Sequence, residues 1–289
     1  MGPAFGLLVG LLAVCVLASF AGPWMPAFDS LAILLPYAAA GLLLIAILVG
    51  SAGRSLRLSA AMLGVIGLIP VVLFALPTRT GDGPALRLLQ HNILYINDGR
   101  LFPDVIQGSD VATFQEVQSV WTALRTLPAP WVGLDCPEAV GIGTAVATRL
   151  TVLDRGCLSS GEAWVRVQSD LGPVTVLSLH LHWPWPAGGD RQMQQVASLV
   201  NEIERLATPL VIGGDFNQMP WSTAVARIAD AADGKVTGGL RATFVKAGGA
   251  IRLPIDHVII PEGWHARTTR GPRHLSDHHS VTARITAGG

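Results

Sequence analysis

The uneven distribution of charge along this 289-residue chain constrains its fold more than any other feature. Residues 1–80 contain only four charged side chains, whereas residues 81–289 contain 17 basic and 19 acidic ones. Over the whole chain 14% of the residues are charged, against about 25% in a typical soluble domain. A wholly soluble protein and a purely membrane-embedded one are both excluded. We expect a membrane-embedded first part and a water-soluble second part.

Three uncharged apolar runs occupy residues 4–20, 31–49 and 58–76. Each is close to the ~20 residues that a helix needs to cross a hydrocarbon core of about 30 Å. The first run lacks the basic residues that begin a signal peptide, and two further runs follow it. The sequence therefore predicts three transmembrane helices within residues 1–77, which bind the chain to a lipid bilayer.

The loop charges predict the orientation of these helices. Arg54 and Arg57 lie between the second and third runs, whereas the first loop carries only Asp29. Because basic loops remain in the cytoplasm, we expect an integral protein of a bacterial inner or plasma membrane whose soluble part is extracytoplasmic. Cys136 and Cys157 either pair there, as an oxidising compartment permits, or remain two free buried thiols.

The soluble part follows a hinge-like stretch at residues 78–84, which contains Pro, Gly and Thr. Residues 85–289 are long enough for one domain with a substantial core. Short runs rich in Val, Leu and Ile recur along them and predict many strands. Apolar residues at three- and four-residue steps predict a helix over residues 190–206, and a second helix is expected over 222–232. This pattern predicts an α/β domain with two packed sheets flanked by helices.

Ionisable and amide side chains gather where the predicted strands end. Each one alone is more often a turn residue, but together they form a set rich in oxygen ligands: Asn92, Glu116, Asp215, Asn217, Asp256, Asp277 and His278. Such a set suits a hard cation such as Mg²⁺ or Mn²⁺ and supplies His–carboxylate pairs for proton transfer. The cysteines lack zinc-ligand spacing. The sequence contains no Walker loop and no Gly-x-Ser-x-Gly elbow.

Six segments resemble, in the same order, the motifs of the endonuclease/exonuclease/phosphatase superfamily: HNIL (91–94), FQEV (114–117), LHLHWP (179–184), GGDFN (213–217), IDHV (255–258) and SDHHSV (276–281). The resemblance covers residues 85–287. It implies a four-layered α/β-sandwich, in which two mixed β-sheets are flanked by helices. The short stretch between Asn92 and Glu116 implies that the first helix of this fold is reduced or lost.

The same resemblance assigns roles to the residues of the motifs. It makes Glu116 the principal ligand of the Mg²⁺ or Mn²⁺ ion, with Asn92 and Asp277 as further ligands. Asp215 would orient or deprotonate the attacking water, and Asn217 would contact the phosphate.

The histidines complete the implied site. His278, oriented by Asp256, would bind the phosphoryl oxygen or donate a proton. His182 matches the mid-chain histidine of the family, and we prefer it to His180 because His-x-Pro at residues 182–184 resembles the version in membrane-anchored bacterial relatives.

The substrate remains open between two classes of phosphodiester. For nucleic acid, Arg267 and Arg270 precede the SDHH motif, but the domain carries a net charge of −2 without a basic footprint. For phospholipid, the domain is tethered to a bilayer, and Trp183 and Trp185 adjoin His182.

The sequence thus predicts a membrane-anchored, divalent-metal-dependent phosphoesterase, more specifically a phosphodiesterase, with no obligate protein partner evident. The alternative is a catalytically degenerate membrane module that binds phosphates or a partner through the same cleft. The intact set of acids, amides and histidines favours the enzyme.

Overall fold

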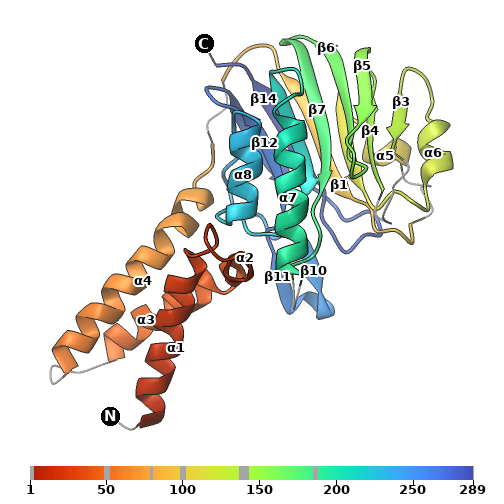
Figure 1. Ribbon diagram of the computed structural model, residues 1–289. Coiled ribbons are helices and arrows are strands. Elements are labelled where there is room, and N and C mark those ends of the chain that lie inside the picture. The colour runs from red at the N-terminus through yellow and green to blue at the C-terminus, as the bar shows by residue number, and fades with distance from the viewer. Residues whose placement is uncertain are drawn as a thin grey trace.

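Residues 3–48, 53–78, 81–97, 102–136, 143–184 and 188–288 are described by the computed structural model of the chain. A group of helices forms the N-terminal part, and a domain built on two β-sheets follows (Figure 1). The N-terminal helices, which we call the helical unit, are α1 (Pro3–Ser19), α2 (Pro26–Asp29), the 3₁₀ turn η1 (Ser30–Ile33), α3 (Leu35–Leu48) and α4 (Arg54–Ala75). Of the predicted linker, residues 79 and 80 lie outside the described residues.

Among the described residues, α4 is the one unbroken helix that is long and apolar enough to cross a membrane. Its 22 residues extend about 33 Å at 1.5 Å per residue. The 17 residues of α1 extend only about 26 Å. The segments Pro26–Ile33 and Leu35–Leu48 are long and apolar enough to cross a membrane only if they are counted as one helix. A bend of 64° separates them. The structure therefore does not support the three predicted spans, because apolar composition does not reveal where a helix breaks.

The helical unit nevertheless exposes much apolar surface. Its helices pack together through a small core that includes Val16, Ala39 and Leu42. Only 17% of the most apolar stretch of α4 is buried. Large apolar side chains face outward from all three long helices: Leu7, Leu11, Val14, Leu44, Ile47, Leu58, Met62 and Ile69. Apolar side chains exposed in such number are typical of a membrane or protein contact.

Two six-stranded sheets form the second part of the chain. The strands of the first sheet are β1 (Leu86–Asn92), β2 (Val111–Gln115), β3 (Val132–Asp135), β4 (Thr144–Thr148), β13 (His265–Arg270) and β14 (Val281–Thr286). Those of the second sheet are β5 (Thr151–Cys157), β6 (Ala163–Ser169), β7 (Gly172–His180), β8 (Leu210–Asp215), β9 (Gly234–Val236) and β12 (Asp256–Pro261). The first sheet has the order β13-β14-β1-β2-β4-β3 and the second the order β5-β6-β7-β8-β12-β9. A small hairpin joins β10 (Phe244–Lys246) to β11 (Ile251–Leu253).

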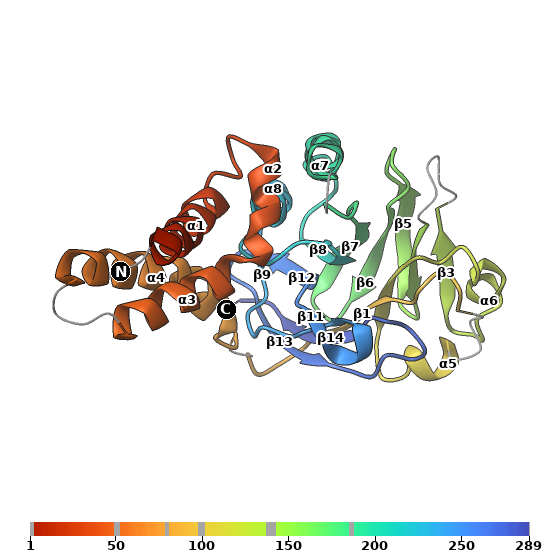
Figure 2. The same cartoon turned by 90° about the horizontal axis from the view of Figure 1, so that it is seen from below.

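Helices flank the sheets, as predicted. α7 (Gly189–Ile203) and α8 (Thr223–Ala231) pack on the second sheet, whereas α5 (Phe102–Val105) and α6 (Trp121–Arg125) lie on the side of the first sheet (Figure 2). The core between the sheets consists mainly of valine. The predicted helices are confirmed, and α5 is a single turn of 4 residues, as the short spacing before Glu116 implied.

The strand pairing brings the polar strand ends to one edge of the domain. β1 and β2 are parallel, and so are β7 and β8, so the carboxyl ends of these central strands meet there. Gly213 and Gly214 let β8 pack closely against the facing sheet and against β7. A Cβ on Gly213 would collide with Thr113 Oγ1 of the facing sheet, and one on Gly214 would collide with the Leu179 carbonyl.

A disulfide joins the two sheets at their lateral edge strands. Cys136 follows β3 and Cys157 ends β5, and their Cα atoms are 5.7 Å apart. β3 and β5 are edge strands of different sheets, so the bond links the sheets covalently. Of the two possibilities left open by the sequence, the structure has the paired form, and Cys15 is free.

Candidate active site

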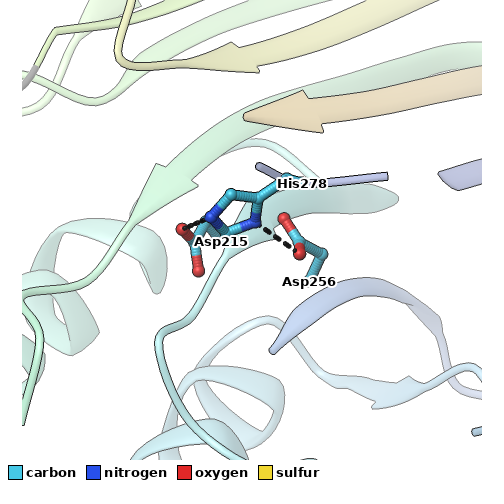
Figure 3. A group of neighbouring side chains, drawn as sticks. All are labelled: Asp215, Asp256 and His278. Atoms are coloured by element: carbon cyan, nitrogen blue, oxygen red, sulfur yellow. Dashed lines mark hydrogen bonds and ion pairs between the residues drawn. The ribbon is translucent and has the colours of Figure 1, made fainter. Parts of the chain in front are cut away.

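Two carboxylates and one imidazole form the centre of the polar edge (Figure 3). His278 Nδ1 lies 2.8 Å from Asp256 Oδ2, and His278 Nε2 lies 3.6 Å from Asp215 Oδ2. Asp215 ends β8 and Asp256 begins β12, and the two residues are direct partners across these antiparallel strands. All three side chains are buried, so their charges interact with little screening by water.

Burial and mutual charge set the protonation states of this group. Burial raises the pKa of Asp215 to about 7, although the nearby His278 opposes the shift. Burial would lower the pKa of His278, but the Asp256 and Asp215 carboxylates raise it to about 10. Burial also acts to raise the pKa of Asp256, but His278 outweighs it and the net direction is down. Near neutral pH, His278 is therefore an imidazolium, Asp256 is ionised and Asp215 titrates.

The second oxygen of Asp256 is held by neighbouring polar groups. Gln90 Nε2 on β1 donates to Asp256 Oδ1 at 3.0 Å and also to Gln115 Oε1 at 2.9 Å. The Asp256 backbone N–H donates to Thr243 Oγ1 at 3.3 Å. These bonds fix the carboxylate that orients His278. Sequence reasoning did not assign this role to Gln90, although Gln90 stands directly before the HNIL segment.

Asn217 lies beside Asp215 in a restrained conformation. Its φ of 50° is left-handed, which L-residues adopt rarely. Its backbone N–H donates to Asp215 Oδ1 at 2.9 Å, and its Nδ2 donates to the Leu181 carbonyl at 2.8 Å. The same Nδ2 is 3.4 Å from His180 Nε2. The amide of Asn217 is thus fixed next to the carboxylate that would activate water.

The structure brings His180, and not the predicted His182, to this centre. His180 is the last residue of β7, pairs with Asp215 on β8, and places Nε2 3.7 Å from Asp215 Oδ2. Burial lowers its pKa to about 3, so the ring is neutral. The backbone of His182 bonds to two glutamine side chains of α7, and no contact of its ring with the centre is found among the described residues. In a strand, residues two apart point to the same face. Because β7 ends at His180, this rule does not place the side chain of His182 on the same face as that of His180.

The predicted metal ligands Glu116 and Asn92 lie at the ends of β2 and β1. Asn92 Nδ2 donates to Glu116 Oε1 at 3.0 Å and to Asp215 Oδ2 at 2.9 Å. Asn92 Oδ1 accepts from the Leu94 backbone N–H at 3.0 Å. The amide nitrogen of Asn92 therefore bridges two carboxylates in this structure. Glu116 also has a left-handed φ of 59°, a strain that is typical of functional positions.

Asp277, the third predicted metal ligand, has one oxygen without a partner. Its Oδ2 forms an ion pair with Lys246 Nζ. Its Oδ1 is buried, has no hydrogen-bond partner among the described residues and lies 4.0 Å from His278 Nε2. A buried carboxylate oxygen without a donor is costly unless a cation satisfies it. Like the carboxylates of Glu116 and Asp215, this oxygen has the donor chemistry that a hard divalent cation prefers. Among the described residues, the acidic and histidine ligand atoms that lie within 4.8 Å of one another are those of Asp215, Asp256 and His278.

Aromatic side chains line the rim. The Phe244 ring on β10 is 5.0 Å from the His278 ring, and the half-exposed Trp183 ring is 6.0 Å from Phe244. Lys246 Nζ lies 5.7 Å from the centre of the Phe244 ring. Trp185, which the sequence also suggested, lies outside the described residues. Sequence reasoning missed Phe244 and Lys246, because only tertiary folding brings their hairpin to the site.

Seven of the eight predicted site residues thus form one contiguous group, linked through Asn92 and His278: Asn92, Glu116, Asp215, Asn217, Asp256, Asp277 and His278.

Comparisons with known proteins extend this agreement. The structure is similar to that of an endonuclease/exonuclease/phosphatase family protein from Bacteroides thetaiotaomicron, with TM-score 0.54, 15% identity and coverage of 72% of this chain and 100% of that one. A mannosyl-6-phosphatase of the same organism gives TM-score 0.53, 15% identity and coverage of 70% and 99%. The catalytic domain of human nocturnin with a bound sulfate anion gives TM-score 0.55, 15% identity and coverage of 72% and 97%. D. rerio TDP2, complexed with a single-strand DNA product, gives TM-score 0.55, 13% identity and coverage of 70% and 99%.

These likenesses establish the fold. Among curated proteins, none matches the chain significantly. The model of one family matches residues 89–278, which include all of the site residues. This chain therefore belongs to the endonuclease/exonuclease/phosphatase family.

Proposed function

We propose that this protein is a divalent-metal-dependent phosphodiesterase that hydrolyses a P–O bond by attack of an activated water. The observation that carries the proposal is the buried array in which His278 lies between Asp256 and Asp215. This array combines the positively charged His278 imidazolium with the Asp215 carboxylate, whose pKa is raised to about 7. A pKa in this range suits a general base at neutral pH.

Each side chain has a defined task in this reaction. Asp215 accepts the proton of the attacking water. The His278 imidazolium, held by Asp256, stabilises the negative charge that develops on the phosphoryl oxygen. Asn217 Nδ2 donates one hydrogen to the Leu181 carbonyl. Its second hydrogen, which faces neutral His180, is donated to the phosphate instead when substrate binds.

The carboxylates of Glu116 and Asp277, with Asn92 beside them, would hold a Mg²⁺ or Mn²⁺ ion. When bound, such an ion supplies Lewis-acid stabilisation of phosphoryl charge. The structural neighbours support a phosphate or similar anion as the ligand of this cleft. Their descriptions name a phosphatase, a bound sulfate and a DNA product.

We further propose that the helical unit anchors the protein in a membrane, with α4 as a span. The exposed apolar side chains of α1, α3 and α4 support this. Arg54 and Arg57 at the first turn of α4 then mark the cytoplasmic end, so the catalytic domain is extracytoplasmic. The Cys136–Cys157 disulfide agrees with that location, because disulfides persist in oxidising compartments.

A phosphodiester at the membrane surface, such as a phospholipid, is the substrate that this arrangement favours. The β10–β11 hairpin at the site and α2 lie at the end of the domain from which the helical unit extends (Figure 1). Trp183 and Ile251 are exposed there, and tryptophan suits the membrane interface.

One observation favours nucleic acid instead. Arg87, Arg284 and Arg267 are direct partners across β1, β14 and β13 and form an exposed basic row, which suits a phosphate backbone.

Hydrolysis of bis-p-nitrophenyl phosphate by the detergent-solubilised full chain tests the proposed reaction. We expect nitrophenol release with Mg²⁺ or Mn²⁺, none with EDTA, and none from Asp215→Ala. Phospholipid vesicles, DNA and RNA are then compared as substrates. A folded protein that releases nothing from any of them, yet binds the metal, would identify the degenerate binding module instead.

A further inference from the structure

The helical unit touches the catalytic domain at a buried carboxylate. Asp29, in α2, is only 1% exposed. Its Oδ1 accepts from the Thr223 backbone N–H at 2.6 Å, and its Oδ2 accepts from the Ala224 N–H at 3.0 Å. These are the first two residues of α8, whose N–H groups have no acceptor within the helix. An anionic side chain at a helix N-terminus is also favoured by the helix dipole.

This arrangement goes beyond ordinary helix capping. α8 already has its own N-cap, because Ser222 Oγ accepts from the Val225 N–H at 3.2 Å. Asp29 adds a second cap from a position 194 residues earlier in the sequence. The junction is also tight, since a Cβ on Gly22 would collide with Thr223 Oγ1 and Asp29 Oδ1.

A second contact lies next to the first. Trp221 Nε1 donates to the Ala32 carbonyl of η1 at 2.9 Å. Ala32 packs in one apolar cluster with Met219 and Ile255. Ile33 of the same turn lines a small pocket together with Asn217. The helical unit therefore contacts the chain along the connection from Asn217 to α8.

That connection begins at the catalytic centre. Asp215 and Asn217 stand at its start, and the backbone of Asn217 is left-handed. A strained conformation persists only where the surroundings fix it. One end of the connection is fixed by β8, whose last residue is Asp215. The other end is fixed by Asp29 and by the Trp221–Ala32 bond.

We infer that Asp29 is a positioning residue for catalysis, through which the helical unit holds Asn217 in its working conformation. The inference rests on the proposed function for its kinetic consequences. The helical unit is thus a part of the active-site scaffold as well as an anchor, and a change in its docking changes the rate of the reaction.

The test uses the full chain in lipid nanodiscs and compares Asp29→Ala with Asp230→Asn, which removes an exposed carboxylate from the same α8. At a temperature where circular dichroism shows both to be folded, Asp29→Ala lowers kcat for bis-p-nitrophenyl phosphate on the order of tenfold. Asp230→Asn leaves kcat unchanged. Asp29→Asn, which keeps one acceptor oxygen, restores part of the rate. Wild-type kcat in Asp29→Ala would overturn the inference.

A double-mutant cycle separates positioning from mere stability. If Asp29 acts through Asn217, Asp29→Ala has less than about a twofold further effect on kcat in an Asn217→Ala background. Independent, multiplicative losses would contradict the inference. If Asp29→Ala does not fold, Trp221→Phe, which removes only the indole N–H, replaces it with the same expectation.

Amide hydrogen exchange gives a readout that needs no activity. Asp29→Ala speeds exchange at Thr223 and Ala224 and also at residues 216–219, whereas Asp230→Asn does neither. Faster exchange confined to α8 would show that Asp29 is only a helix cap. If the wild type hydrolyses no phosphoester, the proposed reaction fails, and the exchange pattern still decides whether Asp29 holds the connection.

Discussion

Asp215 and Asp256 are direct cross-strand partners on β8 and β12, and the imidazole of His278 contacts both of them. Like charges in this position are destabilising without a counter-charge. The imidazolium supplies that charge and in return has its pKa raised to about 10. This mutual dependence makes the three residues one unit, and it predicts how the unit responds to substitution.

Removing a member of this unit lowers the rate by a large factor. We expect Asp215→Asn and His278→Ala each to reduce kcat by roughly 10²–10⁴-fold. In the proposed reaction Asp215 supplies the base and His278 supplies the positive charge, so each variant loses a group that acts on the reacting atoms. Steady-state hydrolysis of bis-p-nitrophenyl phosphate measures the effect, and near-wild-type turnover by either variant would refute the role of that residue.

The two neighbouring histidines are predicted to differ. His180→Ala lowers kcat by about tenfold or more, because the ring packs between Asp215 and the Asn217 amide. His182→Ala stays within about twofold, because the hydrogen bonds of His182 among the described residues are made by its backbone and not by its ring. The reverse order of effects would mean that His182 is the functional histidine after all.

The metal ligands are predicted to change metal affinity. Glu116→Gln and Asp277→Asn each raise the Mg²⁺ concentration for half-maximal activity by roughly 10–100-fold, since each removes an anionic oxygen. Glu262→Gln is the control, because Glu262 is exposed and pairs with Lys235 instead. Metal titration of activity, paired with calorimetric titration of Mg²⁺ binding, gives the measurement. Equal Mg²⁺ requirements in all variants would place the ion elsewhere.

The buried neutral histidines are predicted to lower the stability of the fold as the pH falls. The raised pKa of Asp215, about 7, acts in the opposite direction, so the contribution of each histidine is measured by substitution. Burial lowers the pKa of His257 to about 4, whereas an unfolded histidine has a pKa of about 6.5. As the pH falls from 6.5 toward 4, the unfolded chain binds a proton that the folded one does not, so stability falls. His257 alone accounts for about 3 kcal/mol by pH 4.

His91 and His180, whose pKa values burial lowers to about 3, act in the same direction. Thermal unfolding of the full chain between pH 4 and 7 tests this prediction. His257→Asn makes the unfolding temperature depend less steeply on pH, whereas substitution of the exposed His265 by Gln leaves this dependence unchanged. Identical slopes in both variants would contradict it.

The disulfide is predicted to stabilise the catalytic domain. Reduction, or the pair Cys136→Ser and Cys157→Ser, lowers its free energy of unfolding by about 3 kcal/mol, because the bond joins edge strands of separate sheets. Cys15→Ser is the matched control, since that thiol is free. An unfolding midpoint that is insensitive to reductant would show that the pair contributes nothing.

The sequence alone determined the division into an apolar and a charged part and named most of the residues that gather in the candidate site. Asp215, Glu116 and His278 stand in short motifs at strand ends, and local patterns report such positions well, because a strand and the residues that follow it are neighbours in the chain. Hydrophobic periodicity likewise located α7 and α8. Exposed edge strands such as β5 and β13 are harder to predict from the sequence, because most of their side chains face solvent and carry little apolar signal.

Only the tertiary structure decided which of several compatible arrangements is formed. It ended β7 at His180 and so selected that histidine over His182. It divided the second apolar run at the bend before α3, paired Cys136 with Cys157, and brought Lys246 to Asp277. It also placed Asp29 on α8. Each of these features depends on contacts between segments distant in the chain, whose free energies no local pattern of residues contains.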